Sequence, residues 1–569
     1  MLAFYRMWLF RKIRDFLFAR QADIFSAAFV LGASVLASRF LGLIRDRVLA
    51  HYFGGEEIAL YFASFRLPDT LFEILILGAL SSAFIPTFIS YISRKKEGEA
   101  WQVLGVMLNL SLLIFLVLAT AVFAFAVPFS SFLAPGFSPA EVSLMAGLTR
   151  VLLAAQGFFV LSFFLTGALK SYQRFWVPAL APIFYNLAII AGVVFFADRA
   201  GIYAPAWGAV WGALLHFLVQ IPLAIRLGFR PVLSLDIFHP GVQKIFRLAA
   251  PRVLELGFLQ VLKASDLFFA SLISTASYGY LTFAAHLEMI PVSLFGLSLA
   301  EASLPALSYL VGRKEEFRNT FFTTFRLILF LILPVAVTFA VLRIPLVRLA
   351  FGADRFTWSS TVMTGYALSL FAMGILGQAL TLYFVRVFYA LSDTATPVVV
   401  GVADVILNIA LSAYLTLVLK LPIWGLAAAF AVSALIQAAV LALLLARRNR
   451  FPLWEFIIPG IKIGIASLFA GVVMYVVLKI FDLSAWDKRF SFLEGFTLPE
   501  AWNLFVLDTR YTKNLIILTV FVALLGAAIY LLACRVFRVR ELSIFARLGR
   551  RLPYLGRTRV PATVAEDEH

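Results

Sequence analysis

Fourteen apolar stretches, most of them 20 residues or longer, run through this chain of 569 residues. About 20 apolar residues in a helix cross the hydrocarbon core of a bilayer, so each stretch is long enough to span it. Apolar residues make up 62% of the chain and charged residues 14%, which predicts an all-α polytopic membrane protein. The expected spans are 24–50, 58–92, 101–128, 143–170, 176–197, 205–226, 244–274, 279–311, 320–342, 361–391, 397–418, 422–446, 456–480 and 513–536.

An internal repeat divides these spans. The segment Ile85–Gly98 resembles Leu304–Phe317, and the pairs Pro86 and Pro305, Arg94 and Arg313, and Pro178 and Pro397 are each 219 residues apart. Each copy holds six spans, which predicts two lobes in parallel repeat around a central cavity, plus two extra C-terminal helices. The expected parts are an interfacial amphipathic helix at 1–23, an N-lobe at 24–230, a C-lobe at 231–450, spans 13 and 14 at 451–540, and a basic tail at 541–569.

Basic residues gather in alternate connections between the spans, as the positive-inside rule requires. They follow spans two, four, six, eight and twelve, and they recur in the tail after span fourteen. We therefore expect both termini in the cytoplasm. This topology accounts for most of the formal net charge of +17, which favours contact with anionic membrane lipids and not with nucleic acid.

The sequence carries no recognisable catalytic or metal motif. Its one cysteine, Cys534, excludes an internal disulfide, and its five histidines lack metal-ligand spacing. No glycine-rich phosphate loop is present. The longest connection, 482–511, contains acidic residues without a catalytic pattern. We predict a transporter and not an enzyme.

Charged residues inside the spans are the candidate site. Charge within a membrane helix costs several kcal/mol unless it faces a wet cavity or a partner, so by default it marks a transport path. The guanidinium group of arginine can bind a phosphate through two parallel N–H donors. Arg39, Arg45 and Arg66 therefore predict a site for an anionic, phosphate-bearing substrate. The alternative is that these arginines anchor helix ends to headgroups. The polar residues expected in the cavity helices are Arg39, Arg45, Asp46, Arg66, Asp69, Glu73, Arg252, Glu255, Lys263, Asp266, His286 and Glu288.

Four motifs together resemble the MurJ (MviN) family of lipid II flippases, in the multidrug/oligosaccharidyl-lipid/polysaccharide exporter superfamily. They are SRFLGLIRD at Ser38–Asp46, the segment Phe65–Pro86, APGF at Ala134–Phe137, and SYQRFWVPALAP before the fifth span. The resemblance implies a protein of the bacterial cytoplasmic membrane. It would carry the undecaprenyl-pyrophosphate-linked peptidoglycan precursor from the inner to the outer leaflet, with spans 13 and 14 forming a groove for the lipid tail. Cell-wall synthesis proteins are possible partners.

The family's functional positions carry over only in part. Its cavity arginines and acid in the first span fall on Arg39, Arg45 and Asp46, and its basic residue before Leu-Pro falls on Arg66. Three other positions differ, because a further arginine falls on Phe72, a glutamate on Leu77 and the arginine of the eighth span on His286. Lys263 and Arg252 are candidates to supply the missing charge.

The resemblance also suggests a sodium site. Asp266 and Asn408 match an acid and an amide that bind sodium in some members, and the next polar position falls on Ser412. Oxygen ligands suit a hard cation, but Asp266 could instead form an ion pair with Lys263. Transport driven by membrane potential is the other option.

Other functions stay open at this point. The main alternative is a flippase for another polyprenyl-linked oligosaccharide or a MATE-like cation-coupled exporter, although such proteins usually have about twelve spans. A membrane glycosyltransferase would need a catalytic loop that this sequence lacks. A scaffold that has lost transport is a further alternative, given Phe72 and His286.

Overall fold

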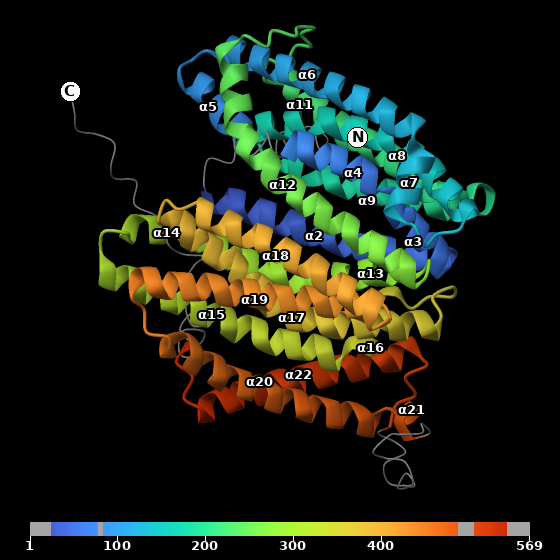
Figure 1. Cartoon of the computed structure of the whole chain (residues 1–569), viewed down its shortest axis with the longest axis vertical. Coiled ribbons are helices and arrows are strands. Elements are labelled where there is room, and N and C mark those ends of the chain that lie inside the picture. Colours follow the sequence, from blue (N-terminus) through green and yellow to red (C-terminus); the bar gives the residue numbers. More distant parts are fainter. Residues whose placement is uncertain (1–23, 78–82, 487–505, 543–569) are drawn as a thin grey trace, which may run out of the picture. The chain divides into compact units, whose positions relative to one another are not determined.

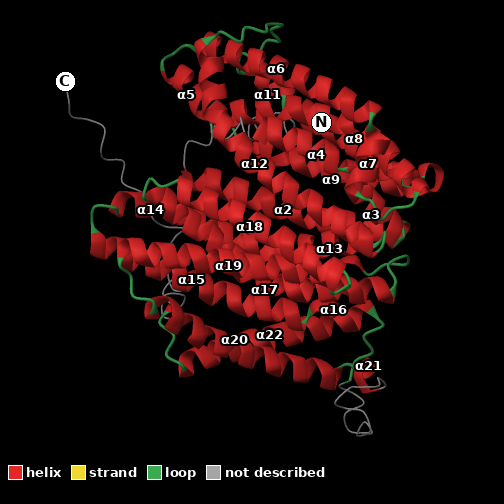
Figure 2. Ribbon diagram, in the orientation of Figure 1, coloured by secondary structure: helices red, strands yellow, loops and turns green. Residues whose placement is uncertain are grey.

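The computed structural model describes residues 24–77, 83–486 and 506–542, with the side chains of 24–31, 250–255 and 485–486 outside the description. The described chain is helical, and its only extended pairing is an isolated bridge between Asp482 and Leu507 (Figure 2). The helix predicted at 1–23 and nearly all of the basic tail lie outside the described residues.

The helices follow one another with short connections (Figure 1). Those of the first half are α2 Ile24–Tyr52, α3 Gly55–Ser64, α4 Arg66–Phe72, the π-helix η1 Glu73–Leu77, α5 Ile85–Ser93, α6 Glu97–Ala124, α7 Ala126–Leu133, α8 Pro139–Ser171, α9 Trp176–Ala200, α10 Tyr203–Leu218 and α11 Ile221–Arg226. Those of the second half are α12 Pro240–Ile273, α13 Ser277–Pro291, η3 Val292–Leu297, α14 Ser298–Leu310, α15 Lys314–Val341, α16 Arg343–Phe351, α17 Trp358–Ala390, α18 Ala395–Ala413, η4 Tyr414–Val418, α19 Trp424–Asn449, α20 Trp454–Phe481, α21 Leu483–Trp486 and α22 Thr512–Val536.

The prediction of an all-α membrane protein is confirmed. Among the described residues, 12 helices are long and apolar enough to cross a membrane, and they match expected spans 3 to 14. Helix α2, with 29 residues, covers the first expected span, and its charged residues Arg39, Arg45, Asp46 and Arg47 lie in its second half. The described residues of the second expected span, 58–92, belong to α3, α4, the π-helix η1 and α5.

The internal repeat reappears in the backbone. Helices α8 and α17 begin 219 residues apart, as do α9 and α18. The π-helices η1 and η3 begin at the same offset, at Glu73 and Val292. Gln173 and Ser392 occupy equivalent turns, and both have a left-handed φ of 58°. Insertions of π-helix commonly mark functional positions, so the repeat preserves the irregular second helix of each copy.

By its contacts the chain forms two compact units. The first comprises 1–290, 344–371 and 398–433, and the second comprises 291–343, 372–397 and 434–569. Within the first unit, α10 packs against α8 and α9, α2 packs against α9, and α6 packs against α8. Within the second unit, α20 lies beside α22 and α15 (Figure 1). The predicted lobe boundaries stay predictions.

Local sequence signals explain two features that support the site. Helix α8 begins with a capping box, because the Ser138 amide donates to Glu141 Oε2 at 2.7 Å and the Glu141 amide donates to Ser138 Oγ at 3.4 Å. Helices α9 and α10 approach closely at Gly208 and Gly212. A Cβ on Gly212 would lie 2.8 Å from the Tyr185 carbonyl oxygen. Small residues four apart allow this contact in membranes, and it fixes the position of Tyr185.

Candidate functional site

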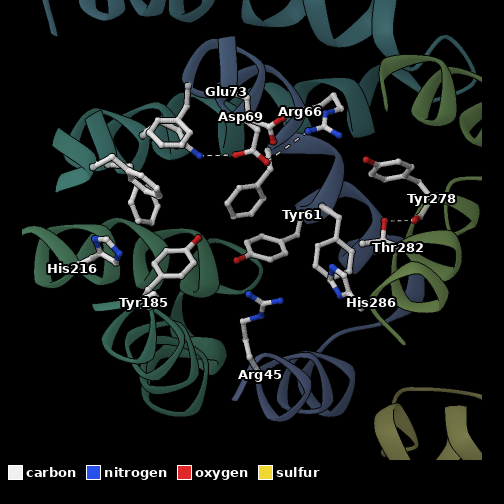
Figure 3. Close-up of a pocket in the computed structure, with 17 residues that line it drawn as sticks. Arg45, Tyr61, Arg66, Asp69, Glu73, Tyr185, His216, Tyr278, Thr282 and His286 are labelled. Carbon is white, nitrogen blue, oxygen red and sulfur yellow. Dashed lines mark hydrogen bonds and ion pairs between the residues drawn. The ribbon is translucent and has the colours of Figure 1, made fainter. Parts of the chain in front are cut away.

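A cavity of about 540 Å³ lies within the first unit (Figure 3). Its wall comes from α2, α3, α4, η1, α8, α9, α10 and α13. Arg66, Asp69 and Glu73 line it from one face of α4 and η1, because residues three and four apart in a helix point the same way. Figure 3 shows the hydroxyl groups of Tyr61 and Tyr185 directed toward the middle of this space, between Arg45 and Asp69. Phenylalanine and tyrosine side chains make up much of the wall, and Arg45, Arg66, Asp69 and Glu73 are its arginine and acidic residues.

Arg45 and His286 meet at one carboxylate. Arg45 donates to Asp46 Oδ1 through Nε at 3.0 Å and through Nη2 at 2.8 Å, and its Nη1 donates to Asn186 Oδ1 at 3.2 Å. His286 Nδ1 lies 2.7 Å from Asp46 Oδ2. Asp46 is 1% exposed, whereas the His286 side chain is 35% exposed and lines the cavity. The cluster joins α2, α9 and α13, and it leaves one edge of Arg45 and His286 facing the cavity.

Arg66 has weaker partners. Its Nη2 lies 3.7 Å from Asp69 Oδ2, and Asp69 Oδ1 accepts a hydrogen bond of 2.6 Å from Gln156 on α8. Arg66 Nε is buried and has no hydrogen-bond partner within the described chain. A buried unpaired donor is costly, and such atoms often indicate a place where another group binds.

Glu73 is held by α12. Lys263 Nζ lies 2.9 Å from Glu73 Oε1 and 2.6 Å from Oε2, and Gln260 donates to Oε2 at 2.6 Å. Lys263 therefore pairs with Glu73 and not with Asp266, so the predicted alternative of a Lys263–Asp266 ion pair is wrong. Sequence reasoning missed this partner because the two residues are 190 positions apart.

The paired charges make the cavity different from the cationic site that the arginines alone suggested. Arg45, Arg66 and Lys263 face the carboxylates of Asp46, Asp69 and Glu73, one acid for each base. The positive charges that line this cavity are therefore balanced by acids of the chain itself.

A polar network behind the cavity was not predicted. His216 lines the cavity from α10, and its Nδ1 lies 2.5 Å from Ser162 Oγ on α8. Gln220 donates to Ser162 Oγ at 2.7 Å and accepts from Thr166 Oγ1 at 2.9 Å. The sequence contained a signal for this network. Ser162 and Thr166, and likewise His216 and Gln220, are polar pairs four residues apart in otherwise apolar spans, so each pair lies on one face of its helix. Tyr61, Tyr185, Tyr278 and Gln156 were also missed.

The other predicted site residues are placed as follows. The Arg39 side chain is exposed and does not line this cavity. Arg252 lies in α12, and its side chain is outside the described residues. Phe72, at the position of an expected arginine, is 8% exposed and packs on Phe163 with ring centroids 5.0 Å apart. The roles assigned to these residues stay predictions.

The predicted sodium ligands lie on two helices. Asn408 and Ser412 lie one turn apart on α18, where Ser412 Oγ donates to Asn408 Oδ1 at 3.3 Å and Asn408 Nδ2 donates to Ser433 Oγ at 3.0 Å. Asp266 lies on α12, without a hydrogen bond to either residue in the described chain. One turn before Asn408, Asp404 Oδ1 is buried and lacks a hydrogen-bond partner among the described residues. No group of three His, Cys, Asp or Glu side chains suited to a metal ion occurs within the described ranges.

Comparison with known proteins identifies the family. A sequence model described as "Lipid II flippase MurJ" matches residues 49–497. The chain belongs to the MurJ family. This membership confirms the resemblance noted in the sequence, and it places the chain among transporters and not among enzymes.

Relatives and solved structures agree with membership in the MurJ family. The "Probable lipid II flippase MurJ" of Rhizobium meliloti (strain 1021) is 30% identical over 484 residues, which cover 80% of this chain and 87% of that protein. The protein of the same name from Bdellovibrio bacteriovorus is 27% identical and covers 81% and 88%. A structure titled "Lipid II flippase MurJ, inward closed conformation" has a TM-score of 0.70 at 24% identity and covers 88% of this chain and 98% of that one. An inward-facing multidrug MATE transporter shares the fold with a TM-score of 0.61 at 16% identity, covering 73% and 94%.

Proposed function

We propose that this chain is a lipid II flippase of the bacterial inner membrane, which moves the undecaprenyl-pyrophosphate-linked peptidoglycan precursor from the inner to the outer leaflet. The observation that carries the proposal is the cavity with Arg45 and Arg66 in its wall, in a chain of the MurJ family. The names of the relatives support this substrate.

The cavity offers groups that suit a diphosphate. Guanidinium groups bind phosphate oxygens through two parallel N–H donors. Arg45 and Arg66 provide such forks, and Arg66 Nε is a donor without a protein partner in the described chain. The diphosphate takes the place of Asp69 beside Arg66 and approaches the cavity edge of Arg45. Because each arginine already has a carboxylate partner, the headgroup binds by exchange of partners, which limits how tightly it is held and allows its release.

Alternating access is supported by contacts at one end of the cavity helices. There Thr275 Oγ1 donates to Glu141 Oε1 at 2.7 Å, and the Gly136 amide donates to Ser271 Oγ at 3.2 Å. Arg47 Nη1 donates to the Leu349 carbonyl at 2.6 Å at the same end of α2. We assign this end to the outer face, where these contacts break when the cavity opens outward.

A crosslink tests the outer gate. In a Cys534→Ala background, the pair Glu141→Cys and Thr275→Cys should be joined by a short bifunctional reagent, and the joined protein should stop transporting lipid II. Each single cysteine is the control and should retain transport after the same treatment. Full transport by the crosslinked protein would exclude opening at this end.

We further propose that membrane potential and a sodium gradient drive the cycle, with sodium held by Asn408 and Ser412 together with Asp266 or Asp404. The support is the oxygen-rich face of α18, since a hard cation prefers oxygen ligands. Transport in vesicles should fall when potassium replaces sodium, and either Asp266→Asn or Asp404→Asn should remove that dependence. Equal rates in the two salts would leave potential as the driving force.

Complementation tests the function itself. The chain is expressed in bacterial cells depleted of their own flippase, and lipid II reaching the outer leaflet is assayed. We expect rescue by the wild type and loss of transport in Arg45→Ala and Arg66→Ala. Arg150→Ala is the matched control, because Arg150 on α8 lies over the Phe123 ring at 5.5 Å and does not line the cavity.

The outcomes separate the candidate functions. Failure of a well-expressed wild type to move lipid II would exclude this substrate and favour another polyprenyl-linked cargo. Equal transport by Arg45→Ala and the wild type would exclude the proposed headgroup site while leaving the flippase function intact.

A further inference from the structure

A second cavity, of about 200 Å³, lies within the second unit and has no part in the site described above. It is formed by α15, by the first turns of α20 and by residues 538–541, which follow α22. Since a water molecule occupies about 30 Å³ of liquid, this space admits a group the size of a phosphate.

The wall of this cavity carries more positive than negative charge. Arg326, Lys462, Arg538 and Arg540 line it, against the two acids Glu455 and Glu541. Both acids have partners, because Glu541 pairs with Arg326 at 2.9 Å and Glu455 pairs with Arg318. Lys462 and Arg538 have no acidic partner within the described chain. The Arg326–Glu541 ion pair is part of the wall, and Lys462 and Arg538 are the two lining cations that a ligand can contact without displacing an acid.

The turn after α22 holds these groups in place. Arg538 has a left-handed φ of 53°, and the Val539 amide donates to the Cys534 carbonyl at 2.9 Å, as in a Schellman motif. A residue other than glycine in this conformation is strained by roughly 1–2 kcal/mol. The turn directs Glu541, which is 3% exposed, back to Arg326 on α15. Arg538 and Arg540 thereby stand beside the start of α20.

The outer surface of α20 is apolar next to the cavity. Trp454, Ile458 and Lys462 line the cavity at helical spacing, and the neighbouring stripe of Ile457, Ile461 and Ile465 is exposed. Trp454 is 62% exposed at the first position of the helix. Tryptophan at a helix end is typical of the membrane interface, and lysine and arginine there attract anionic headgroups. Lys462 and an apolar surface for acyl chains are thus adjacent on α20, and Arg538 lines the same cavity from the turn after α22.

We infer that this cavity binds the phosphate headgroup of an anionic phospholipid, with Lys462 and Arg538 contacting the phosphate and the acyl chains lying along Ile457, Ile461 and Ile465. The charge of the rim selects an anionic lipid over a zwitterionic one. The apolar stripe selects a lipid over a free phosphate ion. The site is separate from the flippase cavity, so its occupant stabilises the packing of α20 and α22 and is not transported.

Native mass spectrometry of the full-length protein, titrated with phosphatidylglycerol or phosphatidylcholine, tests this site. The wild type should bind phosphatidylglycerol more tightly than phosphatidylcholine. Lys462→Gln and Arg538→Gln should each weaken phosphatidylglycerol binding by about fivefold, since each cation near a membrane surface contributes about that factor. Binding of phosphatidylcholine should not change, and excess inorganic phosphate should not displace the lipid.

Arg535→Gln is the matched control, because Arg535 is an exposed arginine in the last turn of α22 that does not line the cavity. It should bind phosphatidylglycerol as the wild type does. Equal weakening by Arg535→Gln would show a diffuse surface charge and overturn the assignment. Unchanged binding in the Lys462→Gln, Arg538→Gln double variant would also overturn it, and displacement by inorganic phosphate would show an ion site and not a lipid site.

Discussion

At the scale of the residue, the carboxylate of Asp46 has two basic partners at once. Asp46 binds both Arg45 and His286, and it is almost fully buried. A carboxylate with two basic partners is a structural anchor for α2 and α13, and at the same time it orients the groups that face the cavity. Substitutions here therefore affect stability and transport together, and the two must be measured separately.

Asp46→Ala should lower the free energy of unfolding by about 3–5 kcal/mol, because it leaves Arg45 without its acceptor in a buried place. Denaturation of the purified protein in detergent measures this change. Adding Arg45→Leu should recover part of the loss, since no unpaired charge then remains. Asp354→Ala, which removes a carboxylate whose side chain is 83% exposed, is the control and should unfold as the wild type does. Unchanged stability in Asp46→Ala would show that the cluster does not anchor the helices.

Phe72→Arg should destabilise the protein by about 3–5 kcal/mol, even though it introduces an arginine that the family resemblance predicted at this position. The reason is that the ring is 8% exposed and packs against Phe159 and Phe163. The thermal unfolding temperature in detergent measures the effect, and Phe72→Leu should cost less. If Phe72→Arg had the stability of the wild type and transported lipid II faster, the cavity would instead accept an arginine at position 72, and the added cation would assist transport.

At the scale of the element, close helix contacts position the aromatic wall. Tyr185 is on α9, and α9 can lie against α10 only because Gly208 and Gly212 have no side chain. Helical spacing places Arg66, Asp69 and Glu73 on one face of α4 and the start of η1, and this face lines the cavity.

Gly212→Ala should lower the free energy of unfolding by about 1–3 kcal/mol, because the added Cβ would lie 2.8 Å from the Tyr185 carbonyl oxygen and force α10 away from α9. Transport should fall as well, since Tyr185 moves with α9. Gly464→Ala on α20 is the control. Its Cβ meets no atom within 4 Å, and alanine favours the helix, so stability should be equal or slightly higher. Equal effects of the two substitutions would exclude close packing as the cause.

At the scale of the whole molecule, hydropathy was enough to predict most of the helices, and it was not enough to predict the site. Expected spans 3 to 14 match helices because an uninterrupted apolar run leaves the backbone no partner but itself in a membrane. The π-helix at Glu73–Leu77 was not predicted, because composition does not reveal one. Arg45, Arg66 and His286 were found because charge is rare in spans. Tyr61, Tyr185 and Tyr278 were missed because tyrosine is common in such proteins, and the Glu73–Lys263 pair was missed because it joins distant segments.

The orientation of the whole chain is a further prediction. Both termini should lie in the cytoplasm, since basic residues cluster at one set of connections. A fluorescent protein fused at the C-terminus should fluoresce, and alkaline phosphatase at the same position should be inactive. The control is a phosphatase inserted after Pro135, between α7 and α8, which should be active. The reverse pattern would invert the assignment of the outer gate.

The one-to-one pairing of acids and bases in the main cavity has a consequence for the energetics of a transport cycle. In the alternating-access cycle proposed above, Arg45, Arg66 and Lys263 reorient together with Asp46, Asp69 and Glu73, so these six groups contribute no net charge to the empty return step. His286, which also contacts Asp46, adds a charge to that step only when it is protonated. In the proposed direction of transport, the loaded step carries the negative charge of the cargo outward, which a cell interior at negative potential favours by about 2.3 kcal/mol per charge for each 100 mV. We therefore expect voltage to act mainly on the loaded step.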